Sequence, residues 1–284
     1  MRIVYIKNKK NAIKFVEYGN SQIETSQILT EKKKYKEAVF FFQQASENIT
    51  KALGYFCLNI NPRGVGHTPI AISKQSISGF ISEMEKFKNY PEKLKRELKS
   101  GSGLLDFLSA ALSPIIDEAN DKAKLAVTFI DKLEGMSKDI PYMRDLWFKT
   151  LYINDNDSKE ALDKALKFST EYNSSDFDSI YTNASTFASF ISDGSESMQI
   201  KAVIKYAKEM SYLLKSTVLA VDLFGFNYLS YMHQQPTRYP KSNLRDYWDD
   251  DAYTEGRELI KKLPDLILQL ETLNKEVYKL INEF

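Results

Sequence analysis

The sequence predicts a mostly α-helical protein, folded as an antiparallel bundle of long helices. In residues 31–61, apolar side chains recur at alternating steps of three and four, which is the spacing of one helix face. The chain also has only 11 Gly and 8 Pro in 284 residues, which favours long helices over many short strands. The apolar stripe consists of Tyr35, Ala38, Phe42, Ala45, Ile49, Ala52 and Phe56.

This helix has recognisable ends and a second row of side chains. Thr30 is the expected N-cap, and Pro62 stops the helix. Gln44, Glu47 and Lys51 follow the same spacing on a neighbouring face. These three side chains can be buried and hydrogen-bonded, or they can lie at a dimer seam. The remaining interpretation is a solvated face with an (i, i+4) ion pair between Glu47 and Lys51.

The N-terminal residues have a different pattern. Residues 2–7 and 12–18 alternate between apolar and polar side chains, and residues 8–11 are turn-like. We therefore expect a short β-hairpin. A lone hairpin is marginal in water, so it should pack on the helices or pair with a second copy of the chain. The predicted organisation is a hairpin in residues 1–20, followed by a single helical domain in residues 21–284.

A second helix follows the first after a short connection. Thr68 and Pro69 are a good N-cap and first helical residue, and the pattern continues to about Lys88. Residues 101–191 are predicted to be a helical insertion. Their first part, 104–136, is apolar and helical in character.

Two further long helices are expected near the end of the chain, in residues 196–223 and 249–284. Pro264 predicts a kink in the second of them. An acidic run at the start of that helix complements the helix dipole, and a Mg²⁺ site is the alternative that these carboxylates leave open. The run consists of Asp246, Asp249, Asp250 and Asp251.

Composition is that of a soluble globular protein, with 43% hydrophobic and 27% charged residues. The net charge of +1 gives no bulk attraction to nucleic acid, so any basic surface must be local. The most apolar segment, residues 212–226, is interrupted by Lys215 and Asp222 and is not expected to span a membrane. The first residues lack the apolar core of a signal peptide. The single Cys57 fits a reducing cytoplasm and is expected to be a small buried residue.

Motifs for metal or cofactor chemistry are missing from the sequence. It has no H-E-x-x-H, C-x-x-C, Walker A or G-x-S-x-G pattern, and only two histidines, His67 and His233. We therefore expect no cofactor and no metal site.

Arg63 and His67 lie just before the predicted start of the second helix, in the run R-G-V-G-H. Free backbone N–H groups at a helix start favour an anion, and Arg63 can add a bidentate contact. A histidine beside an RNA 2′-OH can act as general acid or base without a metal. The alternative is structural, with the glycines forming a tight turn and His67 capping or packing.

A second cluster, His233-Gln-Gln-Pro-Thr-Arg-Tyr-Pro240, precedes the closing helix. Arg238 is a planar donor for phosphate, and Tyr239 offers an aromatic face on which a base can stack. We predict His233, Arg238 and Tyr239 as ligand-binding residues. The alternative is that Tyr239 fills the core while Arg238 pairs with a nearby aspartate.

Two of these stretches resemble one family. The run A-x-x-F-F-Q-Q-A-x-E-x-x-x-K-A-L, residues 38–53, is similar to the first helix of the HEPN (higher eukaryotes and prokaryotes nucleotide-binding) domains of bacteria and archaea. The Arg238-Tyr239-Pro240 turn, with the acidic segment and long helix after it, resembles the closing part of the same family. The two pieces occur in the family's order and cover about a third of the chain.

The resemblance implies a protein that binds nucleotide or nucleic acid and works as a homodimer, and we expect it in the cytoplasm. The implied dimer seam includes the first helix and the loop with His67. The partner implied is a nucleotidyltransferase, in a toxin–antitoxin or defence system. Catalytic members carry an Arg followed after four to six residues by His, late in the fold. Arg63 and His67 are separated by three residues and lie early. The alternatives are a metal-independent endoribonuclease using Arg63 and His67, and a non-enzymatic helical scaffold for protein contacts.

Overall fold

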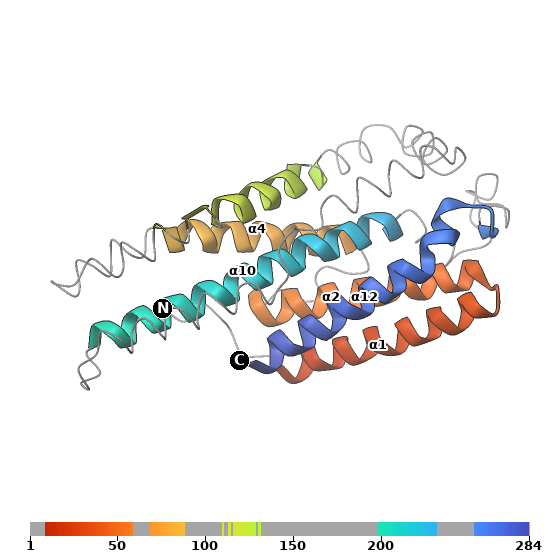
Figure 1. Ribbon diagram of the computed structural model, residues 1–284, viewed down its shortest axis with the longest axis horizontal. Helices are drawn as coiled ribbons and strands as arrows, with labels where there is room; N and C mark the ends of the chain where they lie inside the picture. Colours follow the sequence, from red (N-terminus) through yellow and green to blue (C-terminus); the bar gives the residue numbers. More distant parts are fainter. Residues whose placement is uncertain are drawn as a thin grey trace.

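The computed structural model is a bundle of long helices (Figure 1). It describes residues 9–58, 69–88, 110, 113–114, 116–128, 130–131, 198–231 and 253–283. The named helices are α1 (Lys9–Glu31), α2 (Tyr35–Leu58), α4 (Pro69–Lys88), α10 (Met198–Tyr231) and α12 (Glu258–Glu283). In this described part of the chain no residue is in a β-strand, which confirms the mostly helical class.

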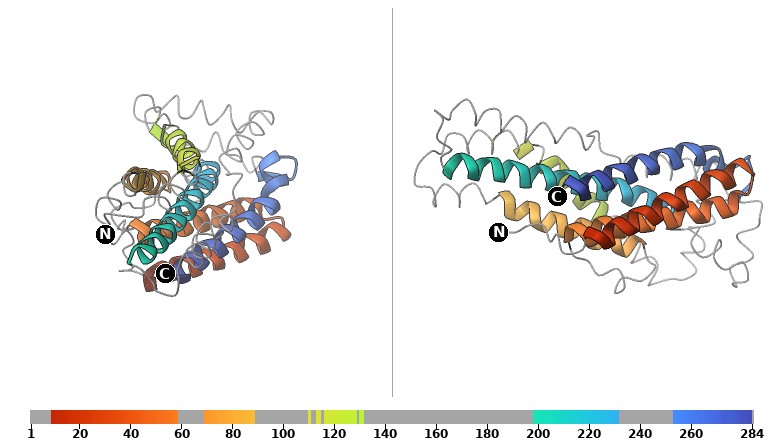
Figure 2. Two further views of the ribbon diagram at one scale, coloured as in Figure 1. Left: turned by 60° about the vertical axis from the view of Figure 1, so that its left-hand side comes forward. Right: turned by 90° about the horizontal axis from the view of Figure 1, so that it is seen from below.

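Helix α2 occupies the centre, with α1 and α12 on one side and α4 and α10 on the other (Figures 1 and 2). Helix α2 runs antiparallel to α1 and to α10, whereas α4 and α12 run in the same direction as α2. The start of α1 lies beside the end of α12, where Lys9 Nζ donates to the Asn282 carbonyl over 3.3 Å. The helical residues 116–128 lie against α4, since Asn120 Nδ2 donates to Glu85 Oε1 over 2.8 Å.

The predicted apolar stripe of α2 is the centre of the core. All of its members except the half-buried Tyr35 are at most 2% exposed. From Phe42 onward α2 is buried around almost its whole circumference, because four other helices pack on it. Removing a phenylalanine such as Phe42 or Phe56 from water is worth about 2 kcal/mol, so this stripe is a main source of stability. The polar side chains buried on α2 consequently need partners inside the protein, and Gln43 Nε2 is one buried group of α2 that has none within the described residues.

The predicted β-hairpin is wrong, since residues 12–18 lie inside the continuous helix α1, which also crosses the proposed boundary at residue 20. The buried face of α1 contains small residues that conceal its helical spacing. Ala12, Val16, Gly19, Ile23 and Ser26 recur at steps of four and three. A Cβ placed on Gly19 would lie 2.8 Å from Ile49 Cγ1, so the glycine lets α1 approach α2 closely. Residues 1–8, which include the other predicted strand, lie outside the described residues.

Several helix boundaries differ from the prediction. Thr30 is not the N-cap of α2; it lies in the last turn of α1, where its hydroxyl donates to the Ser26 carbonyl. Helix α4 begins at Pro69 and continues to Lys88, as predicted. Helix α10 continues eight residues past the predicted end at residue 223, and α12 begins at Glu258, later than predicted, with Pro264 inside it. None of the described helices combines the length and apolar character needed to cross a bilayer.

The turn between α1 and α2 is a compact helix C-cap. The amide of Lys34 donates to the Leu29 carbonyl over 2.8 Å, and the amide of Lys33 donates to the Thr30 carbonyl over 3.0 Å. This is the hydrogen-bond pattern of a Schellman motif, which needs a left-handed residue after the helix. Lys33 supplies it with φ 57°, at a position where glycine is the usual residue.

Replacing Lys33 by glycine should relieve this conformational cost. We expect Lys33→Gly to raise the free energy of unfolding by up to about 1 kcal/mol, because the ion pair lost with Glu255 is exposed and weak. Urea unfolding would measure the change. The matched control is Lys32→Gly, which lacks a positive φ and should lower stability. A Lys33→Gly protein less stable than Lys32→Gly would contradict this account of the turn.

Candidate functional site

A buried polar cluster joins three helices in the core. The Asn227 cluster consists of Ser46 and Thr50 on α2, Ser73 on α4 and Asn227 on α10, all at most 2% exposed. Ser46 Oγ donates to Asn227 Oδ1 over 2.8 Å. Asn227 Nδ2 donates to Thr50 Oγ1 over 2.7 Å and to Ser73 Oγ over 2.9 Å. The Asn227 amide therefore uses its acceptor and both donor directions within one set of hydroxyl groups.

The position of the Asn227 cluster determines which parts of the chain meet. Asn227 is four residues before the end of α10, and Ser73 is four residues after the start of α4. Their hydrogen bond holds the end of one helix beside the start of the other. The connection before α4 therefore ends close to the point where the connection after α10 begins. These two connections carry the residues that the sequence predicts to bind a ligand.

A second polar cluster lies further along the α2–α10 contact. Cys57 Sγ lies 3.1 Å from Tyr212 Oη and 3.6 Å from Ser216 Oγ. Ser216 also donates to the Tyr212 carbonyl over 2.8 Å. Burial raises the pKa of the Cys57 thiol from 9.0 to about 11, and burial likewise raises the pKa of Tyr212 well above its ordinary value. Cys57 is buried as predicted, and its high pKa makes it a poor nucleophile near neutral pH.

The second row of α2 is an internal ion pair. Glu47 and Lys51 form the predicted contact, with Lys51 Nζ 2.5 Å from Glu47 Oε1. They are only 2% and 7% exposed, so the solvated-face interpretation is wrong. Burial within one chain leaves these two side chains almost no surface for a dimer contact. Gln44 is half-buried and donates to Gln43 Oε1 over 3.4 Å.

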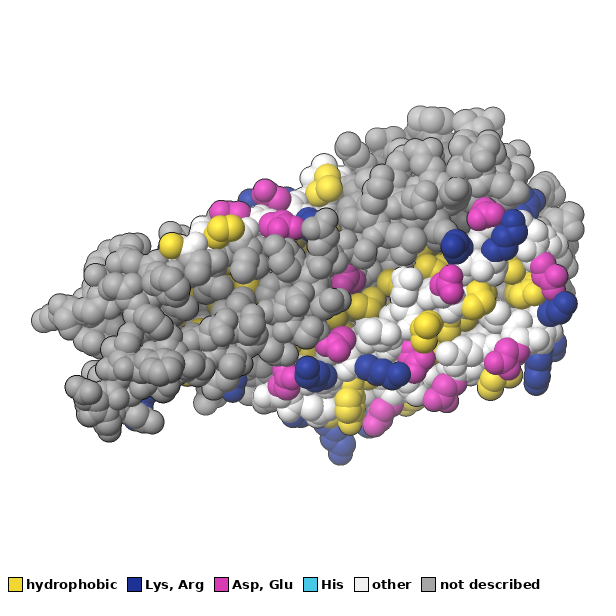
Figure 3. Space-filling view, in the orientation of Figure 1, with side chains coloured by type: hydrophobic (Ala, Val, Ile, Leu, Met, Phe, Trp, Pro, Cys, Tyr) yellow, Lys and Arg dark blue, Asp and Glu magenta, His cyan; other side chains and the backbone are white. Residues whose placement is uncertain are grey.

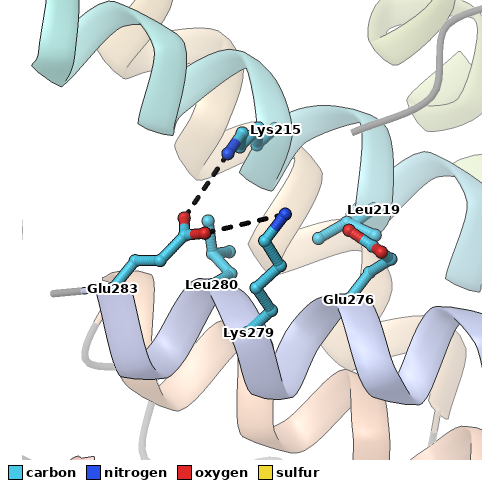
Figure 4. A pocket seen from close by; sticks show the side chains of 6 residues that line it. All are labelled: Lys215, Leu219, Glu276, Lys279, Leu280 and Glu283. Carbon is cyan, nitrogen blue, oxygen red and sulfur yellow. Dashed lines mark hydrogen bonds and ion pairs between the residues drawn. The ribbon is translucent and has the colours of Figure 1, made fainter. Parts of the chain in front are cut away.

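A shallow groove lies between α10 and the end of α12 (Figure 4). Lys215 and Lys279 both approach the Glu283 carboxylate, at 3.4 Å and 3.8 Å, while Leu219 and Leu280 form part of the groove wall. Its volume of about 170 Å³ includes open solvent. Charged groups that satisfy one another fill this groove, so it is a helix contact and not a ligand cavity. No group of three His, Cys, Asp or Glu side chains within the described ranges could hold a metal ion.

The described residues do not include the predicted ligand and catalytic residues. Arg63, His67, His233, Arg238 and Tyr239 all lie outside them, as do the aspartates of the acidic run. The structure instead reveals the Asn227 cluster, which the sequence reasoning missed. The available signal was a set of polar residues on helix faces that are otherwise apolar, such as Asn227 within L-F-G-F-N-Y-L.

Comparisons with family models, with curated proteins and with solved structures found no match to this chain. The fold and the described site therefore define the class on their own. The chain is a helical-bundle protein whose central helix is held by buried polar contacts.

Removing the Asn227 side chain should destabilise the protein strongly. Asn227→Ala removes the shared partner of the Ser46, Thr50 and Ser73 hydroxyls in the core. Thr50 keeps its bond to the Ser46 carbonyl, whereas each hydroxyl that is left unpaired costs about 1–3 kcal/mol. We expect a loss of about 2–4 kcal/mol in chemical denaturation. Asn282→Ala is the control, because that asparagine is exposed and its amide donates to the Tyr278 carbonyl within the same helix. If both variants lose a similar, small amount of unfolding free energy, the Asn227 cluster does not stabilise the core as described.

Stability should decrease with alkaline pH because of Cys57. The pKa of the Cys57 thiol is higher in the folded chain than in the unfolded chain, so folding favours the neutral thiol. The contribution of Cys57 to the free energy of unfolding is therefore fully present below pH 9. It is lost between about pH 9 and 11, at about 1.4 kcal/mol per pH unit, since the unfolded chain ionises there first. The free energy of unfolding under reducing conditions at pH 8, 9 and 10 would show this. Cys57→Ala should decrease less steeply than wild type, and equal slopes would refute the assignment to Cys57.

Proposed function

We propose that this chain is a HEPN-like helical protein that binds nucleotide or nucleic acid. The ligand would be held between the connection before α4, with Arg63 and His67, and the connection after α10, with His233, Arg238 and Tyr239. The observation that supports this most directly is the Asn227 cluster, because it brings the attachment points of both connections together.

The two predicted histidines lie only a few residues along the chain from the Asn227 cluster. His67 is six residues before Ser73, and His233 is six residues after Asn227. Four of the six steps on each side are helical, so each histidine is at most about 13 Å along the chain from Ser73 or Asn227. Two segments separated by more than 160 residues in sequence can therefore contribute to a single site.

The chemistry of the residues favours a phosphate-bearing ligand. Arginine binds phosphate through two parallel N–H donors, and tyrosine stacks on a base. The start of α4 adds the positive end of a 20-residue helix dipole beside the first connection. Arg238 and Arg63 would hold phosphate and Tyr239 would hold the base.

The resemblance to HEPN domains also suggests partners. On the basis of that resemblance alone, we include in the proposal a homodimer and a nucleotidyltransferase partner within a toxin–antitoxin or defence system. Because Glu47 and Lys51 are buried within one chain, a dimer seam would have to use other residues.

Binding of a labelled 20-nucleotide RNA and of ATP to the purified chain tests the proposal. We expect Arg238→Ala to weaken binding about tenfold or more, because a bidentate phosphate contact is lost. Arg238→Lys should recover only part of the lost affinity, because lysine keeps the positive charge but lacks the two parallel N–H donors of the guanidinium. Lys14→Ala, which removes one exposed charge from α1, is the matched control.

Two outcomes would change the assignment. If the wild-type chain binds neither RNA nor ATP, the proposal is wrong. If RNA is cleaved in EDTA and His67→Ala abolishes the cleavage, the chain is a metal-independent nuclease.

A further inference from the structure

Gln43 on α2 is a buried amide with an unused hydrogen-bond donor. On the face of the bundle in Figure 3, the described positive and negative side chains are interspersed, and neither sign of charge dominates. The core differs, because Gln43 is 0% exposed and its Nε2 has no acceptor among the described residues. Its Oε1 accepts a hydrogen bond from Gln44 Nε2 over 3.4 Å. Buried amide donors are nearly always paired in native proteins, so this one indicates an acceptor on a bound group.

Gln43 lies on the face of α2 that meets α4 and α10. It precedes Ser46 by three residues and Thr50 by seven, so the three side chains share one side of the helix. Ser46 and Thr50 are both bonded to Asn227 on α10, and Asn227 is also bonded to Ser73 on α4. The Gln43 side chain therefore faces the region where α4 and α10 approach α2.

Helix α4 runs in the same direction as α2. Thr50 and Ser73 meet through their shared partner Asn227. Further along the same two helices, a Cβ placed on Gly79 would lie 2.7 Å from Leu58 Cδ1. Both helices advance toward higher residue numbers between these two contacts, so their starts lie at the same end of the bundle.

The start of α4 lies close to the level of Gln43. At 1.5 Å for each helical residue, Gln43 is about 10 Å before Thr50 along α2. Pro69 begins α4 and is about 6 Å before Ser73 on the same scale. Gln43 is consequently about 4 Å beyond the start of α4, on the side toward which the first N–H groups of a helix point.

The start of α4 contributes donors to the same place. The first N–H groups of a helix have no partner within that helix, and they carry the positive end of the helix dipole. Helix α4 is 20 residues long, and helix N-termini of this kind bind oxyanions. The next carboxylate along α2 is Glu47, which is paired with Lys51. The backbone donors of α4 and the free amide of Gln43 therefore converge on one position.

We propose that Gln43 contacts an oxyanion held at the start of α4, with Nε2 donating to one of its oxygens. The oxyanion is a phosphate or a carboxylate group, because both accept hydrogen bonds from amide donors. Because Gln43 is buried, this hydrogen bond forms in a low-dielectric environment, where it is stronger than in water. The inference rests on the proposed function for the ligand's place beside α4, and it adds a contact from the central helix.

Gln43→Met tests this contact, because methionine has a similar length and volume but no amide. Inorganic phosphate, acetate and ATP are each titrated against the purified full chain by calorimetry. We expect Gln43→Met to weaken binding about tenfold or more, since one hydrogen bond to a charged group is lost. Whichever of phosphate and acetate binds with this dependence on Gln43 identifies the oxyanion.

Thermal unfolding without ligand separates a binding role from a structural one. Gln43→Met removes an unpaired buried donor, so its thermal midpoint should equal or exceed that of the wild type. A lower midpoint together with weaker binding would show that Gln43 only supports the fold, and would overturn the inference. Gln269→Met is the matched control, because that glutamine is exposed on α12, and binding should stay within about twofold of wild type.

The outcomes distinguish this inference from the proposed function. If ATP binding depends on Arg238 and is unchanged in Gln43→Met, the proposed function holds and the inference is overturned. If phosphate or acetate binds through Gln43 while neither ATP nor RNA binds, the inference holds and the proposed function is wrong. Absence of binding by phosphate, acetate and ATP, or equal weakening in Gln269→Met, also overturns the inference.

Discussion

Burial of α2 from Phe42 onward is the constraint on which the rest of the structure depends. A helix in contact with four neighbours has little surface on which to leave polar groups, and α2 carries Ser46, Glu47, Thr50 and Lys51 in its buried half. Each of these groups would destabilise the core by several kcal/mol if it were unpaired. The hydroxyls meet Asn227, and the two charges meet each other. The requirement to pair these groups fixes how α2 is placed against α10 and α4.

The same constraint links the core to the proposed function. Apolar side chains alone tolerate sliding of one helix along another, whereas Asn227 has one place where both Thr50 and Ser73 are within reach. Fixing the end of α10 against the start of α4 also fixes where the two connections leave the bundle. A ligand site built from both would be anchored by the core at one end of each connection.

The sequence predicted those features that depend on local pattern. The spacing of Phe42, Ile49 and Phe56 marked the core face of α2, and Pro69 marked the start of α4, because each signal lies within one or two turns of helix. Helix α1 was misjudged since Gly19 and Ser26, which are buried, do not count as apolar in a pattern. Contacts between distant residues, such as Ser46 with Asn227 or Lys33 with Glu255, could not be predicted. A polar residue on an apolar face indicates that a partner exists, but not which one.

A double-mutant cycle between Ser73 and Asn227 tests the central claim most directly. The two residues come from different helices and share one hydrogen bond, so Ser73→Ala and Asn227→Ala should not be additive in the free energy of unfolding. We predict a coupling energy of about 1 kcal/mol or more. Losses that add within about 0.3 kcal/mol would show that α4 and α10 do not meet at this cluster.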